Sequence, residues 1–152
     1  MHKYDTARPY AASYVLLMSE GKYLFVRRAN TDWMNGYYSL PAGKVEKNEG
    51  FLAAAIREAQ EEVGVTIAPE DLDFALLMWR HEADEPDMEW CDAVFTAGSW
   101  QGEPRNAEPR LHDEIAWFPP DALPDNVIPH ERKIIEAALR GKLYLEHDEF
   151  AK

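Results

Sequence analysis

Three glutamates near the end of one predicted helix are the residues best suited to chemistry. Glu58, Glu61 and Glu62 lie in the run Arg57-Glu58-Ala59-Gln60-Glu61-Glu62. Like charges three and four residues apart on a helix repel one another, and the helix dipole disfavours anions in the last turns. The cluster therefore destabilises the helix unless a cation binds there. Clustered carboxylates suit a hard divalent ion such as magnesium, and an acidic face in solvent is the alternative interpretation.

The segment that carries these glutamates has the periodicity of an amphipathic helix over residues 50–63. Four apolar residues recur at the spacing of one helical face: Leu52, Ile56, Ala59 and Val63. We expect this stripe to pack on the core, with the three glutamates on the opposite side. Asn48 is the expected N-cap, and Gly64 is expected to end the helix.

A longer signature of fixed spacing includes this helix. The matching residues, in order, are Gly43, Glu49, Arg57, Glu58, Ala59, Glu61, Glu62, Gly64 and Val65. The stretch from Gly43 to Val65 resembles the box of the Nudix hydrolases, MutT-like members included, and the fold resemblance extends over about residues 11–140. Two residues depart from the usual pattern, because Ala59 is small for its aliphatic position and Ala42 stands where many members carry glycine.

This resemblance implies a magnesium-dependent hydrolase in which manganese can substitute. The metal ligands that it implies are the Gly43 carbonyl and the carboxylates of Glu58, Glu61, Glu62 and Glu108. The catalytic residues that it implies are the three box glutamates, with Arg57 and Glu49 orienting Glu58. Glu108 lies where nucleoside-triphosphate-cleaving members add a ligand from a loop, counted from a turn at residues 100–104 that resembles theirs. Glu103, inside that turn, is expected to brace it.

The general base stays open at this point, because members of the family differ in the group that accepts the proton. Glu58 is the first candidate, and Glu61, Glu62 and a loop acid are the others. His81 and His112 are bases in principle, although histidines in such positions are more typical of surfaces and turns.

Five residues outside the box are expected to bind substrate: Arg27, Arg28, Trp33, Tyr37 and Asn126. The arginine pair follows the first predicted hairpin, at a position from which family members touch substrate, and a solvated pair is an equal alternative. Trp33 and Tyr37 lie in the loop before the box, and Asn126 lies where triphosphate-cleaving members read the base. The strand-borne tryptophans are expected to be in the core or half-buried: Trp79, Trp90 and Trp117.

The expected reaction is cleavage of a phosphoanhydride bond by attack of water at phosphorus. The expected substrate is a nucleoside di- or triphosphate or a related nucleoside diphosphate derivative. A nucleotide-sugar or dinucleotide polyphosphate hydrolase is the alternative, and His81-Glu82 lacks the tyrosine or proline that hints at those classes. A non-catalytic Nudix-fold nucleotide-binding regulator is disfavoured because every box carboxylate is present.

The amino-acid composition and net charge limit the kinds of partner that the protein can bind. The 152 residues include 28 acids and 16 lysines and arginines, for a formal charge of -12, which repels nucleic-acid polymers and anionic membranes. We therefore expect a small-molecule nucleotide as partner and a cytoplasmic protein, with a homodimer left open. One cysteine, Cys91, excludes an intrachain disulfide, and the apolar residues 11–18 are too few to span a bilayer.

The elements that position these residues alternate between strand and helix patterns over one expected domain, residues 1–152. Strands are expected at residues 11–18, 23–26, 37–40, 74–80, 90–97 and 116–118. A second helix at residues 130–140 should end at Gly141 and bury Ile134, Ile135, Ala138 and Leu139. Residues 82–89 should form an exposed acidic loop, and residues 98–112 an irregular one. This order predicts an α/β fold, an α/β/α sandwich around a mixed β-sheet.

Overall fold

The computed structural model describes residues 6–150, and the expected domain extends beyond them at both ends. The elements in chain order are β1 (Tyr10–Ser19), β2 (Lys22–Arg28), β3 (Tyr38–Ser39), β4 (Ala42–Lys44), α1 (Phe51–Val63), η1 (Pro69–Asp71), β5 (Leu72–His81), β6 (Glu89–Ala97), β7 (His112–Phe118), α2 (Pro129–Leu139) and β8 (Tyr144–Asp148). Every strand and helix expected above is present, and β4, η1 and β8 are additional.

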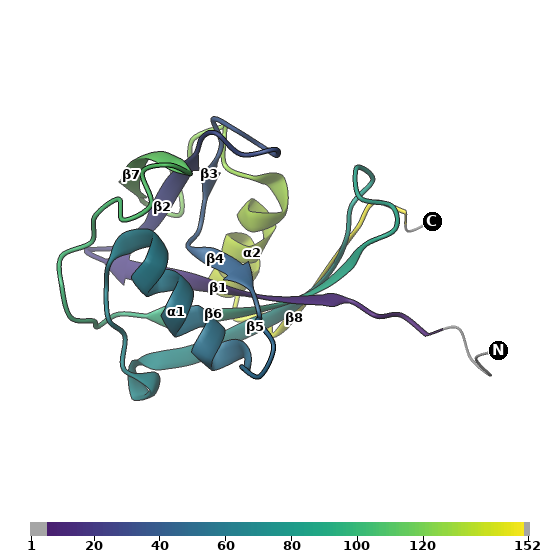
Figure 1. Cartoon of the computed structure of the whole chain (residues 1–152), viewed down its shortest axis with the longest axis horizontal. Helices are drawn as coiled ribbons and strands as arrows, with labels where there is room; N and C mark the ends of the chain where they lie inside the picture. The colour runs from purple at the N-terminus through teal and green to yellow at the C-terminus, as the bar shows by residue number, and fades with distance from the viewer. Residues whose placement is uncertain (1–5, 151–152) are drawn as a thin grey trace.

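The strands form one mixed sheet (Figure 1). Its order is β3-β2-β1-β6-β5-β8, with β4 added on β1 and β7 added on β2. The β1–β6 and β5–β8 pairs are parallel, and the other pairs are antiparallel. β1 turns into β2 at Glu20 and Gly21, which both have positive φ, as a type I′ hairpin turn requires.

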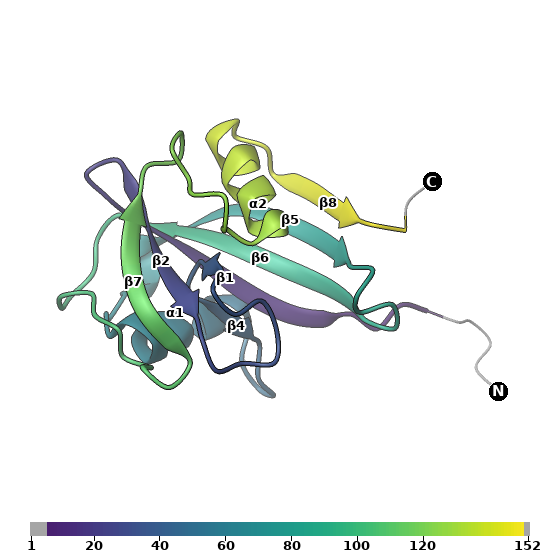
Figure 2. The same ribbon diagram turned by 90° about the horizontal axis from the view of Figure 1, so that it is seen from above.

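Two helices cover opposite faces of this sheet (Figure 2). On one face Ile134 and Ile135 of α2 pack in the same core as Leu16 of β1. On the other face Ala55, Ala59 and Val63 of α1 pack with Val15 and Leu17 of β1. Successive β1 residues therefore serve two separate cores, and the predicted α/β/α sandwich is confirmed.

The buried side of α1 differs from the predicted stripe. Ala55, Ala59 and Val63 are buried, but Leu52 is 38% exposed, so its place in the stripe was wrong. Glu62 is buried on the sheet side instead of lying opposite it. The N-cap prediction was also wrong, because Gly50 is the N-cap residue and Asn48 lies in the preceding turn with φ of 70°. The helix ends at Gly64 as predicted, in the left-handed conformation.

Two further side chains lie differently from expectation. Leu139, at the end of α2, is exposed, because the inward face of the helix consists of Ile134, Ile135 and Ala137. Glu82, expected in an exposed loop, is buried beside Arg80 and His130. Over residues 6–150, neither helix has the length and apolar character needed to cross a membrane.

Candidate active site

Two box carboxylates meet the short strand β4 at successive residues. The backbone N–H of Ala42 donates to Glu62 Oε2 at 3.1 Å. Next along the strand, Gly43 lies directly against Glu58, so that a Cβ at Gly43 would collide with the Glu58 carboxylate. This close approach explains physically why the position takes glycine. β4 and α1 thereby bring the Gly43 backbone and two carboxylates into one place.

Arg57 is the cation that organises the helix side of the site. Its Nε and Nη2 donate to the two carboxylate oxygens of Glu49 at 3.2 and 2.6 Å. Its Nη1 donates to Glu58 at 2.8 Å and to Glu61 at 3.3 Å, and Nη2 also donates to the Lys44 carbonyl at 3.0 Å. One guanidinium therefore fixes Glu58 relative to the turn before the helix. Glu61, with 49% of its side chain exposed, lies at the solvent side of this cluster.

The negative charge of the site is only partly compensated. Burial raises the pKa of Glu58 to about 7, although the hydrogen bond from Arg57 opposes this rise. Burial raises the pKa of Glu62 well above its ordinary value, and the charge of Glu58 adds to it. Hydrogen bonding to Arg57 lowers the pKa of Glu49. The two carboxylates that face β4 thus carry an electrostatic cost that a bound cation would relieve.

The loop before β7 docks on the C-terminal end of α1. The N–H groups of Arg105 and Ala107 donate to the Val63 and Glu62 carbonyls, each at 3.0 Å. Glu108 follows directly, half-buried. Burial and the charge of Glu61 raise its pKa, and its own charge contributes to the raised pKa of both Glu58 and Glu62.

Glu103, the other loop acid, lies away from the box carboxylates. It is exposed and borders a separate hollow with Ser19, Trp100 and Trp117. Of the two loop acids, only Glu108 therefore acts electrostatically on the box.

The donor set fits magnesium. The groups brought together are carboxylate and carbonyl oxygens, the hard ligands that this ion prefers. Across residues 6–150, no three His, Cys, Asp or Glu side chains are arranged to enclose an ion by themselves. Magnesium usually keeps several waters and binds through one or two carboxylates together with substrate phosphates. A site built from Glu58, Glu62 and the Gly43 carbonyl, open toward substrate, matches that coordination preference.

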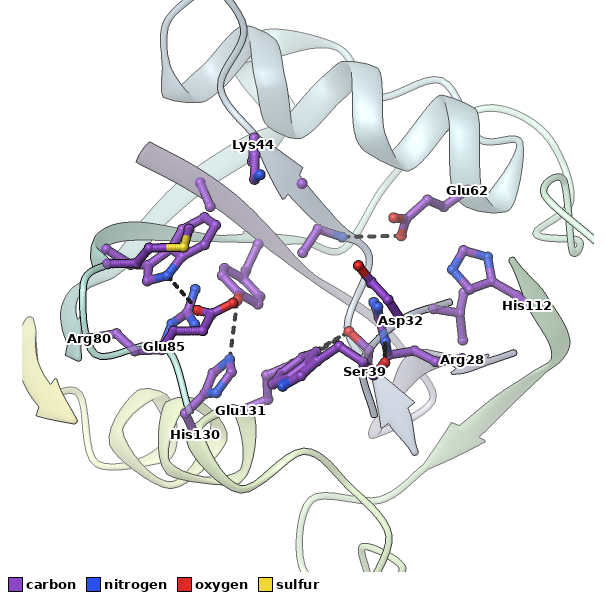
Figure 3. Close-up of a pocket in the computed structure, with 18 residues that line it drawn as sticks. Arg28, Asp32, Ser39, Lys44, Glu62, Arg80, Glu85, His112, His130 and Glu131 are labelled. Carbon is purple, nitrogen blue, oxygen red and sulfur yellow. Dashed lines mark hydrogen bonds between the residues drawn. The ribbon is translucent and has the colours of Figure 1, made fainter. Parts of the chain in front are cut away.

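A cavity of about 330 Å³ opens beside these residues, on the α2 face of the sheet (Figure 3). Gly43, Lys44 and Glu62 border it on the box side, Arg28 borders it from the end of β2, and Trp33 borders it from the loop that follows. The Arg28 Nε donates to the Trp33 carbonyl at 2.8 Å, and its guanidinium lies 5.3 Å from the Trp33 ring centroid. Two of the five expected substrate residues therefore line the cavity.

The other three expected substrate residues do not border this cavity. The Arg27 Nε donates to Asp113 at 2.7 Å on the flank of the sheet. The Asn126 side chain donates to the Gly36 carbonyl at 2.8 Å, and the Asn126 backbone carbonyl accepts from the Tyr38 N–H at 2.7 Å. Tyr37 contributes backbone hydrogen bonds to Arg28 and Met34. In this conformation, Arg27 and Asn126 hold neighbouring segments together.

His112, considered above as a base, is a buried wall of the cavity. Burial lowers its pKa to about 4, so it is neutral near pH 7. Among the described residues its Nδ1 has no hydrogen-bond partner. His81 instead lies on β5 near Pro86 and Asp148, outside the cavity lining.

Sequence reasoning missed Glu131, which links α2 to the box. This residue is 1% exposed, and its carboxylate accepts from the Leu40 N–H at 2.6 Å and from the Ser39 hydroxyl at 3.1 and 3.2 Å. Burial raises its pKa to about 8. The signal was the helix start, since Pro129 at the first position followed by an acid in the first turn is a typical N-terminal pattern.

A buried ionic group beneath the cavity was missed as well. The Arg80 Nε donates to Asp92 Oδ2 at 2.7 Å, and its Nη1 lies 3.7 Å from Glu82 Oε1. The His130 Nδ1 lies 2.5 Å from the same Glu82 oxygen, and burial lowers the His130 pKa. A charged residue inside each of two apolar strand patterns, Arg80 and Asp92, was the available signal.

Known proteins share both this fold and this sequence pattern. The family model described as the NUDIX domain matches residues 7–138, so the chain belongs to the Nudix hydrolase family, as predicted. It is similar to the human 8-oxo-dGDP phosphatase NUDT18, with 26% identity over 141 residues, covering 91% of this chain and 41% of that protein. The chain therefore spans less than half of the length of this relative.

Two further comparisons agree with that assignment. The RNA pyrophosphohydrolase of Erythrobacter litoralis is 26% identical over 121 residues, covering 69% of this chain and 73% of that protein. The crystal structure of a MutT NUDIX hydrolase from Burkholderia pseudomallei superposes with a TM-score of 0.76 at 27% identity, covering 86% of this chain and 98% of that one.

Proposed function

We propose that this protein is a magnesium-dependent pyrophosphohydrolase that cleaves a phosphoanhydride bond of a nucleoside di- or triphosphate. The observation that carries the proposal is the meeting of Glu58, Glu62 and Gly43 at β4, at the edge of a cavity that also contains Arg28 and Lys44. Carboxylates for a divalent ion and cations for phosphate oxygens thus lie side by side. The human relative's name, 8-oxo-dGDP phosphatase, supports a nucleoside diphosphate or triphosphate as substrate.

The residues of the chain divide the work of hydrolysis. Glu58, Glu61, Glu62, Glu108 and the Gly43 carbonyl are the proposed ligands of a magnesium ion, which would supply positive charge for the phosphate oxygens and would make a water more acidic. Glu58 is the leading general base, because its carboxylate lies against Gly43 at the proposed metal site and is held there by Arg57. The proposed role of Arg57 and Glu49 is to hold that carboxylate in position, as their hydrogen bonds allow.

The cations of the cavity complete the proposed phosphate site. Arg28 has two of its nitrogens bonded to the loop, to the Trp33 carbonyl and the Thr31 hydroxyl, which holds the guanidinium at the cavity wall. The Lys44 ammonium lies over the rings of Tyr10 and Trp90, at 5.3 and 5.5 Å from their centroids. Within residues 6–150, neither Arg28 nor Lys44 is ion-paired with a carboxylate, so each can bind a phosphate without breaking an ion pair.

A substrate panel tests this proposal. Wild-type protein is treated with EDTA, and nucleoside di- and triphosphates, a nucleotide sugar, a dinucleotide polyphosphate and 5′-triphosphorylated RNA are offered with and without Mg²⁺. Phosphate and pyrophosphate release and the nucleotide product are measured. We expect release of a nucleoside monophosphate from a simple nucleotide with Mg²⁺ or Mn²⁺ only. Nucleotide binding without turnover of any substrate would instead indicate the regulatory alternative.

A further inference from the structure

The cavity has two chemically different ends. Figure 3 shows Glu62 and His112 at one end and Arg80, Glu85 and His130 at the other. If the phosphates lie at the Glu62 end, as the proposed function requires, the base of the nucleotide lies toward Glu85. The inference below rests on that function and concerns which base is accepted.

Flat and apolar side chains form the wall of this second end. Trp90 on β6 is only 8% exposed, and Met88 and Trp33 border the cavity with it. The Arg80 guanidinium covers the Trp90 ring at 4.6 Å from its centroid. Because Asp92 and Glu82 already balance the charge of Arg80, that arginine adds little net charge for a ligand.

Glu85 is the polar group that faces the cavity from the loop between β5 and β6. Its neighbours in the loop, Asp84 and Asp87, are exposed, whereas Glu85 is half-buried at the cavity wall. Its backbone is fixed by hydrogen bonds from its N–H to the Glu82 carbonyl and from the Met88 N–H to its own carbonyl, at 3.1 and 3.0 Å.

The Glu85 carboxylate has acceptor capacity left over. Its Oε2 accepts from the Trp90 Nε1–H at 3.0 Å, which holds the group in place. Among residues 6–150, its other oxygen receives no hydrogen bond from the protein. An ionised carboxylate offers about four acceptor positions and no donor, so a ligand that binds here must present hydrogen-bond donors, and on a nucleotide base these are N–H groups.

We propose that Glu85 is a specificity-determining residue that selects guanine-type bases by accepting from their ring N1–H and exocyclic amino group. Two neighbouring donors on one edge suit a carboxylate in the same paired way as a guanidinium does. Adenine and cytosine place an acceptor nitrogen beside the amino group, and uracil places its single N–H between two carbonyls. Each of those edges turns a lone pair toward the Glu85 oxygens, which is repulsive.

Inosine triphosphate provides the sharpest probe, because hypoxanthine keeps the N1–H of guanine and lacks its amino group. We measure kcat/KM with Mg²⁺ for GTP, ITP and ATP on the full chain and on Glu85→Gln. The glutamine can still accept from Trp90 through its amide oxygen, but it turns an NH₂ donor toward the base. Asp87→Asn, which removes an exposed charge from the same loop, is the matched control.

Wild-type protein and Asp87→Asn should prefer GTP over ITP by about ten-fold and over ATP by about a hundred-fold, since each lost hydrogen bond to a charged group has roughly that effect. Glu85→Gln should bring the GTP to ITP ratio close to one, with the change in KM larger than in kcat. A GTP to ITP ratio that is near one in the wild type, or unchanged in Glu85→Gln, would overturn the assignment. If none of the three nucleotides is cleaved, the proposed function fails instead. In that case calorimetric measurement of GMP and IMP binding tests the role of Glu85 separately.

Discussion

Replacing Glu62 by glutamine should stabilise the protein in the absence of metal while abolishing turnover. Glu62 is 9% exposed, and within residues 6–150 the only hydrogen bond to its carboxylate comes from the Ala42 N–H. Glutamine keeps an oxygen for that bond and removes a buried negative charge that Glu58 and Glu108 repel. Removing a poorly compensated buried charge is often stabilising, whereas the loss of a metal ligand is not compatible with fast hydrolysis.

The size of the effect can be worked from the neighbouring carboxylate. A pKa of about 7 for Glu58 against an ordinary value of 4.5 corresponds to roughly 3 kcal/mol of destabilisation when the group is ionised. Glu62 is also buried, and relieving a buried, poorly compensated polar group contributes about 1 to 3 kcal/mol, so we expect Glu62→Gln to raise the free energy of unfolding by that amount at pH 8.5. The melting temperature should then rise by about 5 to 10 °C.

The pH dependence follows from the direction of the shift. Because the pKa of Glu62 is higher in the folded than in the unfolded protein, the folded state holds its proton more tightly. The wild type therefore loses stability as pH rises above the ordinary glutamate pKa, and the variant does not lose this part. The advantage of Glu62→Gln should be small at pH 5, close to the ordinary glutamate pKa, and larger at pH 8.5.

Thermal unfolding with EDTA at pH 5 and pH 8.5 measures this difference, with Glu103→Gln as a control for losing an exposed charge. Saturating Mg²⁺ should raise the melting temperature of the wild type and leave that of Glu62→Gln nearly unchanged. A variant less stable than wild type at pH 8.5, or a gain independent of pH, would refute the reasoning that Glu62 is a strained, cation-binding carboxylate.

Three further predictions concern the same site. Glu108→Gln should lower kcat and weaken the affinity for Mg²⁺ far more than Glu103→Gln does. Equal, small effects of the two substitutions in a magnesium titration would show that Glu108 is an ordinary surface acid. Arg57→Lys should lose the paired contact with Glu49, lowering kcat at least ten-fold in steady-state kinetics with little change in KM; an unaltered kcat would remove its positioning role. His112→Asn should leave the pH–rate profile between pH 6 and 9 in place, because burial holds the His112 pKa at about 4, and loss of a limb in that range would make His112 a titrating base.

The fold could be predicted because its signals are local. The apolar runs of β1, β5 and β6 and the spacing within the box each belong to one continuous segment. The helix stripe failed in part because Leu52, in the first turn of α1, is exposed, whereas Ala55, one turn further on the buried side, is not. Asn48 failed as a cap because it lies two residues before the cap, Gly50, in a turn closed by hydrogen bonds between Glu46 and Glu49.

The candidate site likewise contains residues that could be predicted from one segment of sequence and residues that only the fold brings together. Residues within the box, such as Arg57 and Glu58, could be named from the sequence, because they stand at the positions of the Nudix box that the chain resembles. Glu85 and Glu131 could not, since they reach the cavity only after the sheet brings β3, α2 and the β5–β6 loop together. Asn126 and Arg27 were expected at the substrate by position, but a position in sequence does not show which hydrogen bonds a side chain forms within the protein.

The central claim is that the carboxylates at β4 support magnesium-dependent hydrolysis of a nucleotide. Its most direct test is the rate of nucleoside monophosphate formation from the best triphosphate as Mg²⁺ is titrated into EDTA-treated wild type and Glu62→Gln. The account predicts no product without metal, saturable recovery in the wild type, and a rate lower by several orders of magnitude in the folded variant. Equal rates for the two proteins, or wild-type turnover that persists in EDTA, would contradict it.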